Sequence, residues 1–168
     1  MNLRRLIQPA MVRLRLETPV PEPLEGEEGL IRRQLTEFKE AVLGEIAALF
    51  EASGQIDRID RLHRELTLRE GKASTAVGRG IAFPHIKTLR AREMLCAIAL
   101  APEGIPFDEP DDEPVRLIVG IISPKDEERA YLHLVRRFSE VFLGDAALPE
   151  ILQARDEHEV IRILSSYL

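Results

Sequence analysis

Two uninterrupted apolar stretches, at residues 95–100 and 117–122, constrain the fold more than any other part of this sequence. Neither stretch alternates apolar with polar residues, which is typical of inner strands that are covered on both faces of a sheet. Helices must therefore lie on both sides of that sheet. With 168 residues, the chain has the length of one domain with a single core.

Apolar residues at steps of three and four predict the helices that cover this sheet. The expected helices span residues 31–49, 56–66 and 127–143, and two short helices close the chain. Arg69 and Glu70 lie at the exit of the second helix. Asp156 and Glu159 have the spacing of a capping box, which predicts the start of the last helix.

The amino-terminal part of the chain predicts an edge strand followed by a linker. Val12, Leu14 and Leu16 alternate with arginines, as in a half-exposed strand. Residues 18–32 are rich in proline and glutamate, so we expect a linker insertion there, within a single domain of residues 1–168. The expected order of elements is β-α-α-β-β-β-α-α-α, in a mixed α/β (α+β) fold.

Charge and cysteine content exclude several classes of protein. A net charge of −6 gives no general affinity for nucleic acid, and no zinc-finger or helix-turn-helix pattern is present. The single cysteine, Cys96, excludes an internal disulfide and a multi-cysteine metal site. The sequence has no apolar stretch long enough for a signal peptide or a membrane span, so we expect a cytoplasmic protein.

One segment, residues 68–87, predicts a reactive histidine. Gly78 and Gly80 permit a tight turn, and residues 81–83 predict a short buried strand that Pro84 ends. His85 is therefore expected at a strand terminus, where ligands usually dock in open α/β sheets. Because an imidazole is partly neutral near pH 7, one of its ring nitrogens can act as a nucleophile.

Other phosphate-binding patterns fit this segment poorly. Gly71-Lys72 is followed by Ala73 where a Walker loop needs serine or threonine. Gly78-Arg79-Gly80 lacks the third glycine of a dinucleotide fingerprint and precedes the expected strand instead of following it. A phosphoryl group on His85 would instead be held by Arg69, by the hydroxyls of Ser74 and Thr75 and by loop amides.

The segment resembles the active-site signature of the type-2 IIA family of the bacterial phosphotransferase system (PTS), the fructose, mannitol and nitrogen-regulatory group. The matching residues are Arg69, Glu70, Ser74, Thr75, Gly78, Gly80, Ile81, Ala82, Pro84 and His85. The resemblance implies a three-layer α/β/α sandwich around a small mixed sheet. It also implies a phosphohistidine carrier, which serves sugar transport or nitrogen regulation without a cofactor or a metal.

The resemblance assigns a role to each site residue. His85 would accept a phosphoryl group from an HPr-like phosphocarrier protein and pass it to a IIB component, or its phosphorylation would be read by a regulated protein. His133, on the helix at residues 127–143, would lie beside His85 and bind the phosphoryl oxygens. Arg69 would supply a fixed positive charge. Ser74, Thr75, Gly78 and Gly80 would form the phosphate-binding loop.

Departures from the family pattern keep other hypotheses open. Ile86 replaces the glycine usual after the histidine, and Arg79, in place of a common asparagine, is expected to add charge near the phosphate. Ile86 favours a regulatory protein-binding module that keeps this fold and the histidine but acts without phosphorylation turnover. A metal-dependent hydrolase using His85, His133 and a carboxylate is a third hypothesis, although no ligand motif supports it. The acidic residues Asp108, Glu109, Asp111, Asp112 and Glu113 are expected to form a solvated loop.

Overall fold

The computed structural model describes residues 3–22, 27–107 and 113–168. Its centre is a mixed sheet of six strands. The strands in spatial order are β1 (Val12–Arg13), β5 (Leu95–Ile105), β6 (Val115–Ser123), β3 (Ile81–Ala82) and β2 (Ala76–Gly78), and β4 (His85–Lys87) also pairs with β6. β5 and β6 are antiparallel, whereas β1 is parallel to β5, and β3 and β4 are both parallel to β6. The predicted mixed α/β fold is confirmed.

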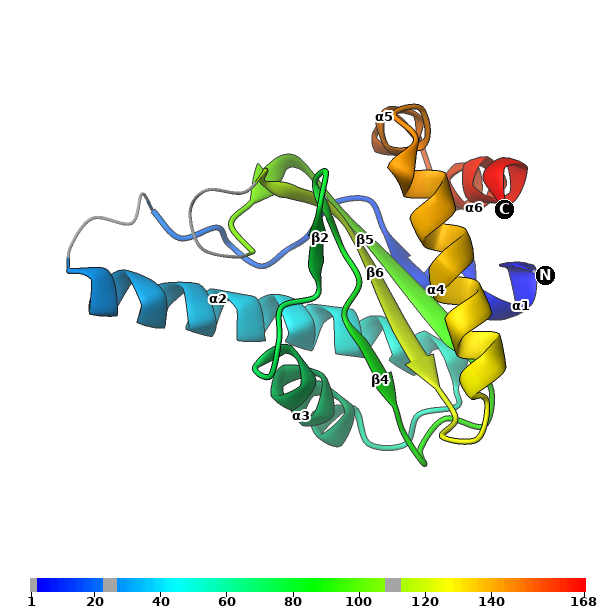
Figure 1. Cartoon of the computed structure of the whole chain (residues 1–168), viewed down its shortest axis with the longest axis horizontal. Coiled ribbons are helices and arrows are strands. Elements are labelled where there is room, and N and C mark those ends of the chain that lie inside the picture. Colours follow the sequence, from blue (N-terminus) through cyan, green and yellow to red (C-terminus); the bar gives the residue numbers. More distant parts are fainter. Residues whose placement is uncertain (1–2, 23–26, 108–112) are drawn as a thin grey trace.

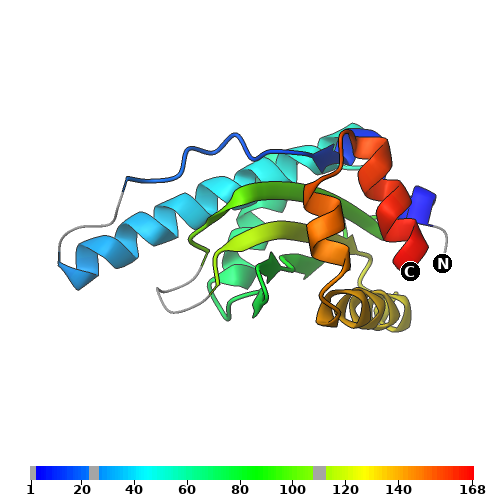
Figure 2. The ribbon, with the colours of Figure 1, turned by 90° about the horizontal axis from the view of Figure 1, so that it is seen from above.

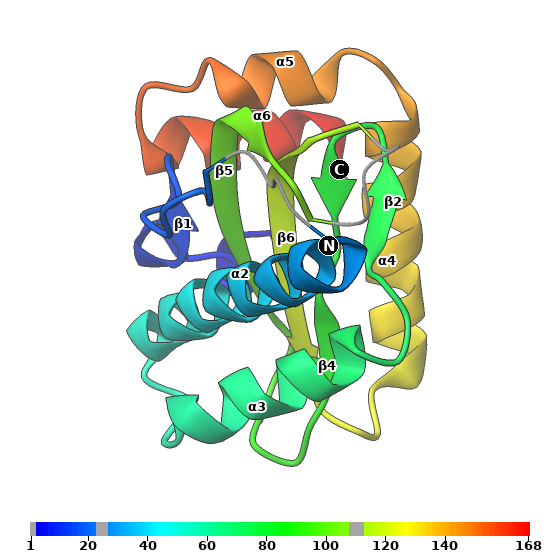
Figure 3. The same ribbon diagram turned by 90° about the vertical axis from the view of Figure 1, so that its left-hand side faces the viewer.

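Helices cover both faces of this sheet. They are α1 (Leu3–Leu6), α2 (Glu28–Leu49), α3 (Ile59–Glu70), α4 (Glu128–Leu143), α5 (Ala147–Leu152) and α6 (Glu157–Tyr167), with 3-10 turns η1 (Pro9–Met11) and η2 (Phe50–Ser53). Figure 3 shows α2 and α3 in front of the strands and α6 behind them. In Figure 1 the same layers lie on either side of β5 and β6.

The two long central strands contribute side chains to two separate apolar clusters. Cys96, Ile98 and Leu100 of β5 pack with the buried faces of α4, α5 and α6. The alternate residues of the same strand, such as Leu95 and Ala97, pack with α2 and α3. This alternation explains why the sequence of an inner strand is apolar at every position.

A close approach of α2 to the sheet requires a glycine in β6. A Cβ atom built on Gly120 would lie 2.6 Å from Cγ2 of Ile46 and 3.4 Å from the Phe50 ring. Any side chain at this position would therefore displace the helix. The buried face of α2 begins at Phe38, and the turns before it project beyond the sheet (Figure 2).

Several expected boundaries are corrected. The helix α2 begins at Glu28, so residues 28–32 are helical and do not belong to the expected linker, of which residues 23–26 lie outside the described residues. The strand predicted at residues 81–83 is β3, which ends at Ala82, and a further strand that was not predicted, β4, follows at residues 85–87. β2, also not predicted, pairs with β3 as a hairpin. Asp108, Glu109, Asp111 and Asp112 of the acidic segment also lie outside the described residues, and Glu113 is exposed.

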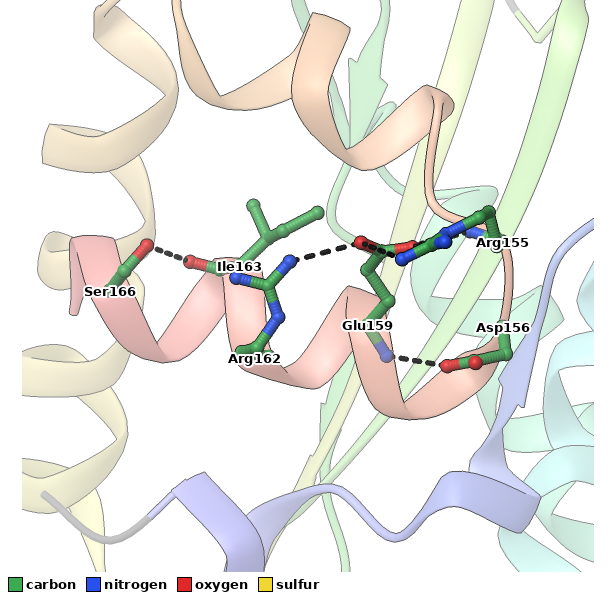
Figure 4. A network of polar contacts seen from close by, with 6 residues as sticks. All are labelled: Arg155, Asp156, Glu159, Arg162, Ile163 and Ser166. Carbon is green, nitrogen blue, oxygen red and sulfur yellow. Dashed lines mark hydrogen bonds and ion pairs between the residues drawn. The ribbon is translucent and has the colours of Figure 1, made fainter.

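The start of α6 is capped where the sequence predicts it (Figure 4). The Asp156 side chain accepts a hydrogen bond from the Glu159 backbone N–H at 2.7 Å. The Glu159 carboxylate accepts from the Arg155 backbone N–H at 2.9 Å and pairs with the Arg162 guanidinium at 3.0 Å. These contacts lower the pKa of Glu159 to about 2, chiefly through the side-chain hydrogen bond from Arg155.

Candidate functional site

His85 opens a strand and does not end one. β3 and β4 both run parallel to β6, and residues 83–84 interrupt the pairing between them. Pro84 has no N–H to donate, but its carbonyl accepts from the Ile121 N–H at 2.9 Å, so the chain stays against β6 through the interruption. His85 then pairs in register with Ile121. β3 ends before Pro84, as expected, and His85 lies at a strand terminus, but at the start of β4 and not at the end of β3.

The hydrogen bonds of His85 fix its tautomer. Its Nδ1 lies 2.8 Å from the Phe83 carbonyl oxygen, which only accepts, so Nδ1 carries the proton. Its Nε2 lies 3.0 Å from Nη2 of Arg69, which only donates, so Nε2 presents its lone pair. Burial lowers the pKa of His85, the hydrogen bond to Phe83 opposes this shift, and the positive charge of Arg69 adds to it. A neutral imidazole with an unprotonated Nε2 can act as a nucleophile once Arg69 releases that atom.

Arg69 reaches His85 from the last turn of α3. Its Nη1 donates to the Ala73 carbonyl oxygen at 2.9 Å while its Nη2 points to His85. The two contacts hold the planar guanidinium beside the imidazole. The sequence predicted Arg69 near His85, and the structure brings the two side chains into hydrogen-bond contact.

A buried carboxylate next to Arg69 holds the neighbouring loop. Glu70 is only 5% exposed and accepts from the backbone N–H and the hydroxyl of Thr75, at 2.9 and 2.5 Å. Lys39 of α2 pairs with the same carboxylate at 3.1 Å. The Thr75 carbonyl accepts from the Phe83 N–H at 2.9 Å, and Phe83 in turn orients His85. Glu70 is thus connected to the His85 imidazole by hydrogen bonds through two intervening residues, Thr75 and Phe83.

The expected phosphate-binding loop divides into two parts. Ser74 and Thr75 lie in the segment that pairs with Phe83, next to the histidine, although the Thr75 hydroxyl already donates to Glu70. Gly78 and Gly80 have positive φ and form the β2–β3 turn. Gly80 pairs near Leu117, whereas His85 pairs with Ile121, and four strand residues span roughly 13 Å. The structure therefore does not bring the glycine amides to His85.

On α4, Tyr131 and not His133 lies against the imidazole. The ring centroids of His85 and Tyr131 are 5.6 Å apart, and Tyr131 is buried. His133 is exposed. Residues two positions apart on a helix are separated by about 200° of rotation, so Tyr131 and His133 point in different directions. Tyr131 is not among the predicted site residues, although it is an aromatic residue that faces the same way as the buried Leu134.

The two substitutions noted in the signature are accommodated away from the imidazole. Ile86 is 6% exposed and packs in the apolar cluster between the sheet and α3, so it does not shield His85. Arg79 pairs with Asp145 at 2.9 Å and also donates to the Leu143 carbonyl. Because Leu143 is the last residue of α4 and Tyr131 lies twelve residues earlier, about 18 Å of helix separates Arg79's contact from the histidine.

Within the described ranges, no group of three or more His, Cys, Asp or Glu side chains is arranged to hold a metal ion. No helix in the same part of the chain combines the length and apolar character needed to cross a membrane.

Comparison with known proteins assigns the family. The family model of the phosphoenolpyruvate-dependent sugar phosphotransferase system, EIIA 2, matches residues 26–167. The chain belongs to this EIIA type-2 family. It is 31% identical over 127 residues to the PTS fructose-specific EIIA component of Haloferax volcanii, covering 76% of this chain and 82% of that protein. It spans only 20% of the fructose-specific EIIABC component of Bacillus subtilis.

Solved EIIA structures share the fold. The nitrogen regulatory protein IIA-Ntr of Neisseria meningitidis superposes with a TM-score of 0.76 at 20% identity, over 96% of this chain and 98% of that one. IIA mannitol of Escherichia coli, in its complex with phosphorylated IIB mannitol, superposes with a TM-score of 0.70 at 16% identity, over 95% and 97%. Membership of the EIIA type-2 family supports a phosphocarrier role in a phosphotransferase system.

Proposed function

We propose that this EIIA-type protein is a cytoplasmic phosphohistidine carrier in which Nε2 of His85 accepts a phosphoryl group from an HPr-like phosphocarrier protein. The observation that carries the proposal is the fixed tautomer of His85, with Nδ1–H held by Phe83 and the Nε2 lone pair presented beside Arg69. A IIB component, or a regulated protein that reads the phosphorylation state, is the proposed recipient. The protein is an intermediate in transfer and does not convert a metabolite.

The transfer step balances without an additional reactant. The Nε2 lone pair of His85 attacks phosphorus, and the bond from phosphorus to the donor's ring nitrogen breaks, returning its electron pair to the donor. Nδ1 keeps its proton and donates a hydrogen bond to the Phe83 carbonyl oxygen, and this hydrogen bond stabilises the positive charge that develops on the imidazole. In a second displacement, a nucleophile of the recipient attacks phosphorus and the bond from phosphorus to Nε2 breaks, returning its electron pair to His85.

Arg69 is proposed to change its partner during the step. In the unphosphorylated protein its Nη2 donates to Nε2, the atom that must attack. As the phosphoryl group arrives, the guanidinium turns to the phosphoryl oxygens, for which its planar donors are well suited. Ser74, whose segment lies beside Phe83, is proposed as a further donor, while Thr75 positions that segment through Glu70.

The proposed roles of the other expected site residues are less direct. His133 remains a proposed phosphoryl-binding residue, although its exposed position on α4 means that the side chain must reach around the helix toward His85. Gly78 and Gly80 are proposed to act on the site only through the β2–β3 turn that they form. The burial of Ile86 removes the observation that favoured a binding module without phosphorylation turnover.

The test is phosphorylation by purified phosphoenolpyruvate, enzyme I and HPr, followed by intact mass measurement and acid treatment. One acid-labile phosphoryl group is expected on the wild-type protein and none on His85→Ala. Arg69→Ala should be labelled at least about tenfold more slowly, the range for loss of one charged donor at a reacting centre. No labelling with HPr from several sources, while a known EIIA control reacts, would overturn the proposal. Unchanged labelling of His133→Ala would remove His133 from the site.

A further inference from the structure

A basic cleft lies beside the proposed phosphoryl site, between α3, β4 and the loop that joins β4 to β5. Figures 1 and 3 show α3 and β4 side by side at this end of the sheet. The cleft has a volume of about 700 Å³. Seven of its lining residues are lysine or arginine and two are acidic, in a chain whose net charge is −6. The cleft thus concentrates positive charge on an acidic protein.

Some of these cations are neutralised locally. Arg90 pairs with Glu65 at 3.1 Å, and Lys87 pairs with Glu128 at 2.6 Å. Arg58 pairs with Asp60 at 3.3 Å, and Arg69 contacts the Ala73 carbonyl and His85. These groups shape the wall of the cleft but have partners already.

Three further cations point to an absent partner. Lys72, Arg92 and Lys125 all line the cleft, and in the part of the chain that the structure describes none of their side chains has an ion pair or a hydrogen bond. They come from three separate segments, namely the loop after α3, the β4–β5 loop and the β6–α4 loop. Like charges gathered around one concavity repel one another, and an anion bound among them would remove that repulsion.

We propose that this cleft binds a small anion that carries at least two phosphate groups. Its volume is in the range of small-molecule sites, which favours a small ligand over the flat face of a protein. Guanidinium and ammonium donors on several walls match phosphate oxygens, and three cations without partners favour a ligand with more than one anionic group. Leu68 and Leu89, 64% and 85% exposed at the same cleft, offer apolar surface to a nucleoside if the phosphates belong to a nucleotide.

The cleft and the phosphoryl site share Arg69, so the two ligands are coupled. A polyphosphate that draws Arg69 into the cleft takes it from His85, and a phosphoryl group on His85 takes it from the cleft. Phosphorylated protein is therefore expected to bind the anion more weakly. This coupling rests on the proposed function, whereas binding to the unphosphorylated protein does not.

The test is isothermal titration of the full chain with inorganic pyrophosphate and, separately, with ATP, both without metal ions, and with sulfate as control. Binding of either probe that is stronger than sulfate and weakens at high ionic strength is expected. Tighter binding of ATP would assign a nucleotide, and equal affinities would assign the phosphates alone. Binding of sulfate with the same affinity as both probes would overturn the proposal.

Two matched sets of variants locate the site. Combining Lys72→Gln, Arg92→Gln and Lys125→Gln should weaken binding at least about tenfold. Arg5→Gln, Arg64→Gln and Arg116→Gln remove the same charge from exposed positions outside the cleft and should change affinity by less than about twofold. Equal losses in both sets would show non-specific attraction and overturn the site.

His85→Ala separates this inference from the proposed function. This variant should still bind the probes, because His85 does not line the cleft. If neither probe binds wild type, but the cleft variants slow labelling by HPr, the cleft is a docking face for an acidic protein and the small-anion site is wrong. That result would leave the phosphocarrier proposal intact.

Discussion

At the scale of single residues, the second proton that His85 can bind, at Nε2, sets the pH dependence of the site. Burial lowers its pKa below the ordinary value of about 6.5, so the folded protein binds this proton less readily than the unfolded chain. The nucleophilic neutral form should therefore persist at pH 7. The stability contribution of this group should fall as the pH drops below about 6.5, and the labelling rate should fall as the pH drops through the lower pKa of the folded protein. NMR titration of the His85 ring nitrogens measures the midpoint directly. A midpoint above the ordinary value would contradict this prediction.

Glu70 provides a second prediction at this scale, because it is buried and is connected by hydrogen bonds to His85 through Thr75 and Phe83. Glu70→Gln puts an amide donor among groups that need an acceptor and removes the charge that faces Lys39. We expect a loss of about 1–3 kcal/mol in the free energy of unfolding and slower labelling of His85.

Glu65→Gln is the matched control for Glu70→Gln. Glu65 lies on the same helix and pairs with Arg90, but both side chains are partly exposed. Its loss should cost less than about 1 kcal/mol in urea unfolding. If both variants lose the same stability and label at the same rate, the positioning role of Glu70 is excluded.

At the scale of the elements, the packing of α2 on β6 depends on the absence of a side chain at Gly120. Gly120→Ala would place its methyl group 2.6 Å from Ile46 and is expected to cost about 1–3 kcal/mol, measured by urea unfolding. Gly29, within α2, has no atom within 4 Å of a built Cβ. Gly29→Ala should instead be neutral or stabilising by up to about 1 kcal/mol, because alanine favours the helix. A neutral Gly120→Ala would mean that α2 is free to shift.

At the scale of the whole molecule, two apolar clusters share one pair of strands. β5 and β6 contribute alternate residues to both clusters, so unfolding of either helical layer would expose apolar side chains of the strands to water. We expect a single cooperative unfolding transition. Tyrosine fluorescence reports the layer with α4 and α6, where Tyr131 and Tyr167 lie, and Phe50→Trp would report the other layer. Different urea midpoints for the two probes would show that the layers unfold separately.

The sequence by itself determined the layers and the reactive segment. Residues 95–100 and 117–122 predicted inner strands, and the apolar steps predicted α2, α3 and α4, because both features depend on periodicity within one segment. The signature around Arg69 and His85 predicted which side chains meet, since a short stretch of chain joins them.

Only the tertiary structure decided contacts that depend on rotation or register between distant segments. Tyr131, and not His133, lies against His85. Successive residues of a helix are rotated by about 100°, and the rotation of α4 about its axis against the sheet is set by its packing. Gly78 and Gly80 are kept away from His85 by the register of β3 and β4 on β6. The basic cleft gathers Lys72, Arg92 and Lys125 from three loops, and charges that are scattered along an acidic chain become a site only when the fold brings them together.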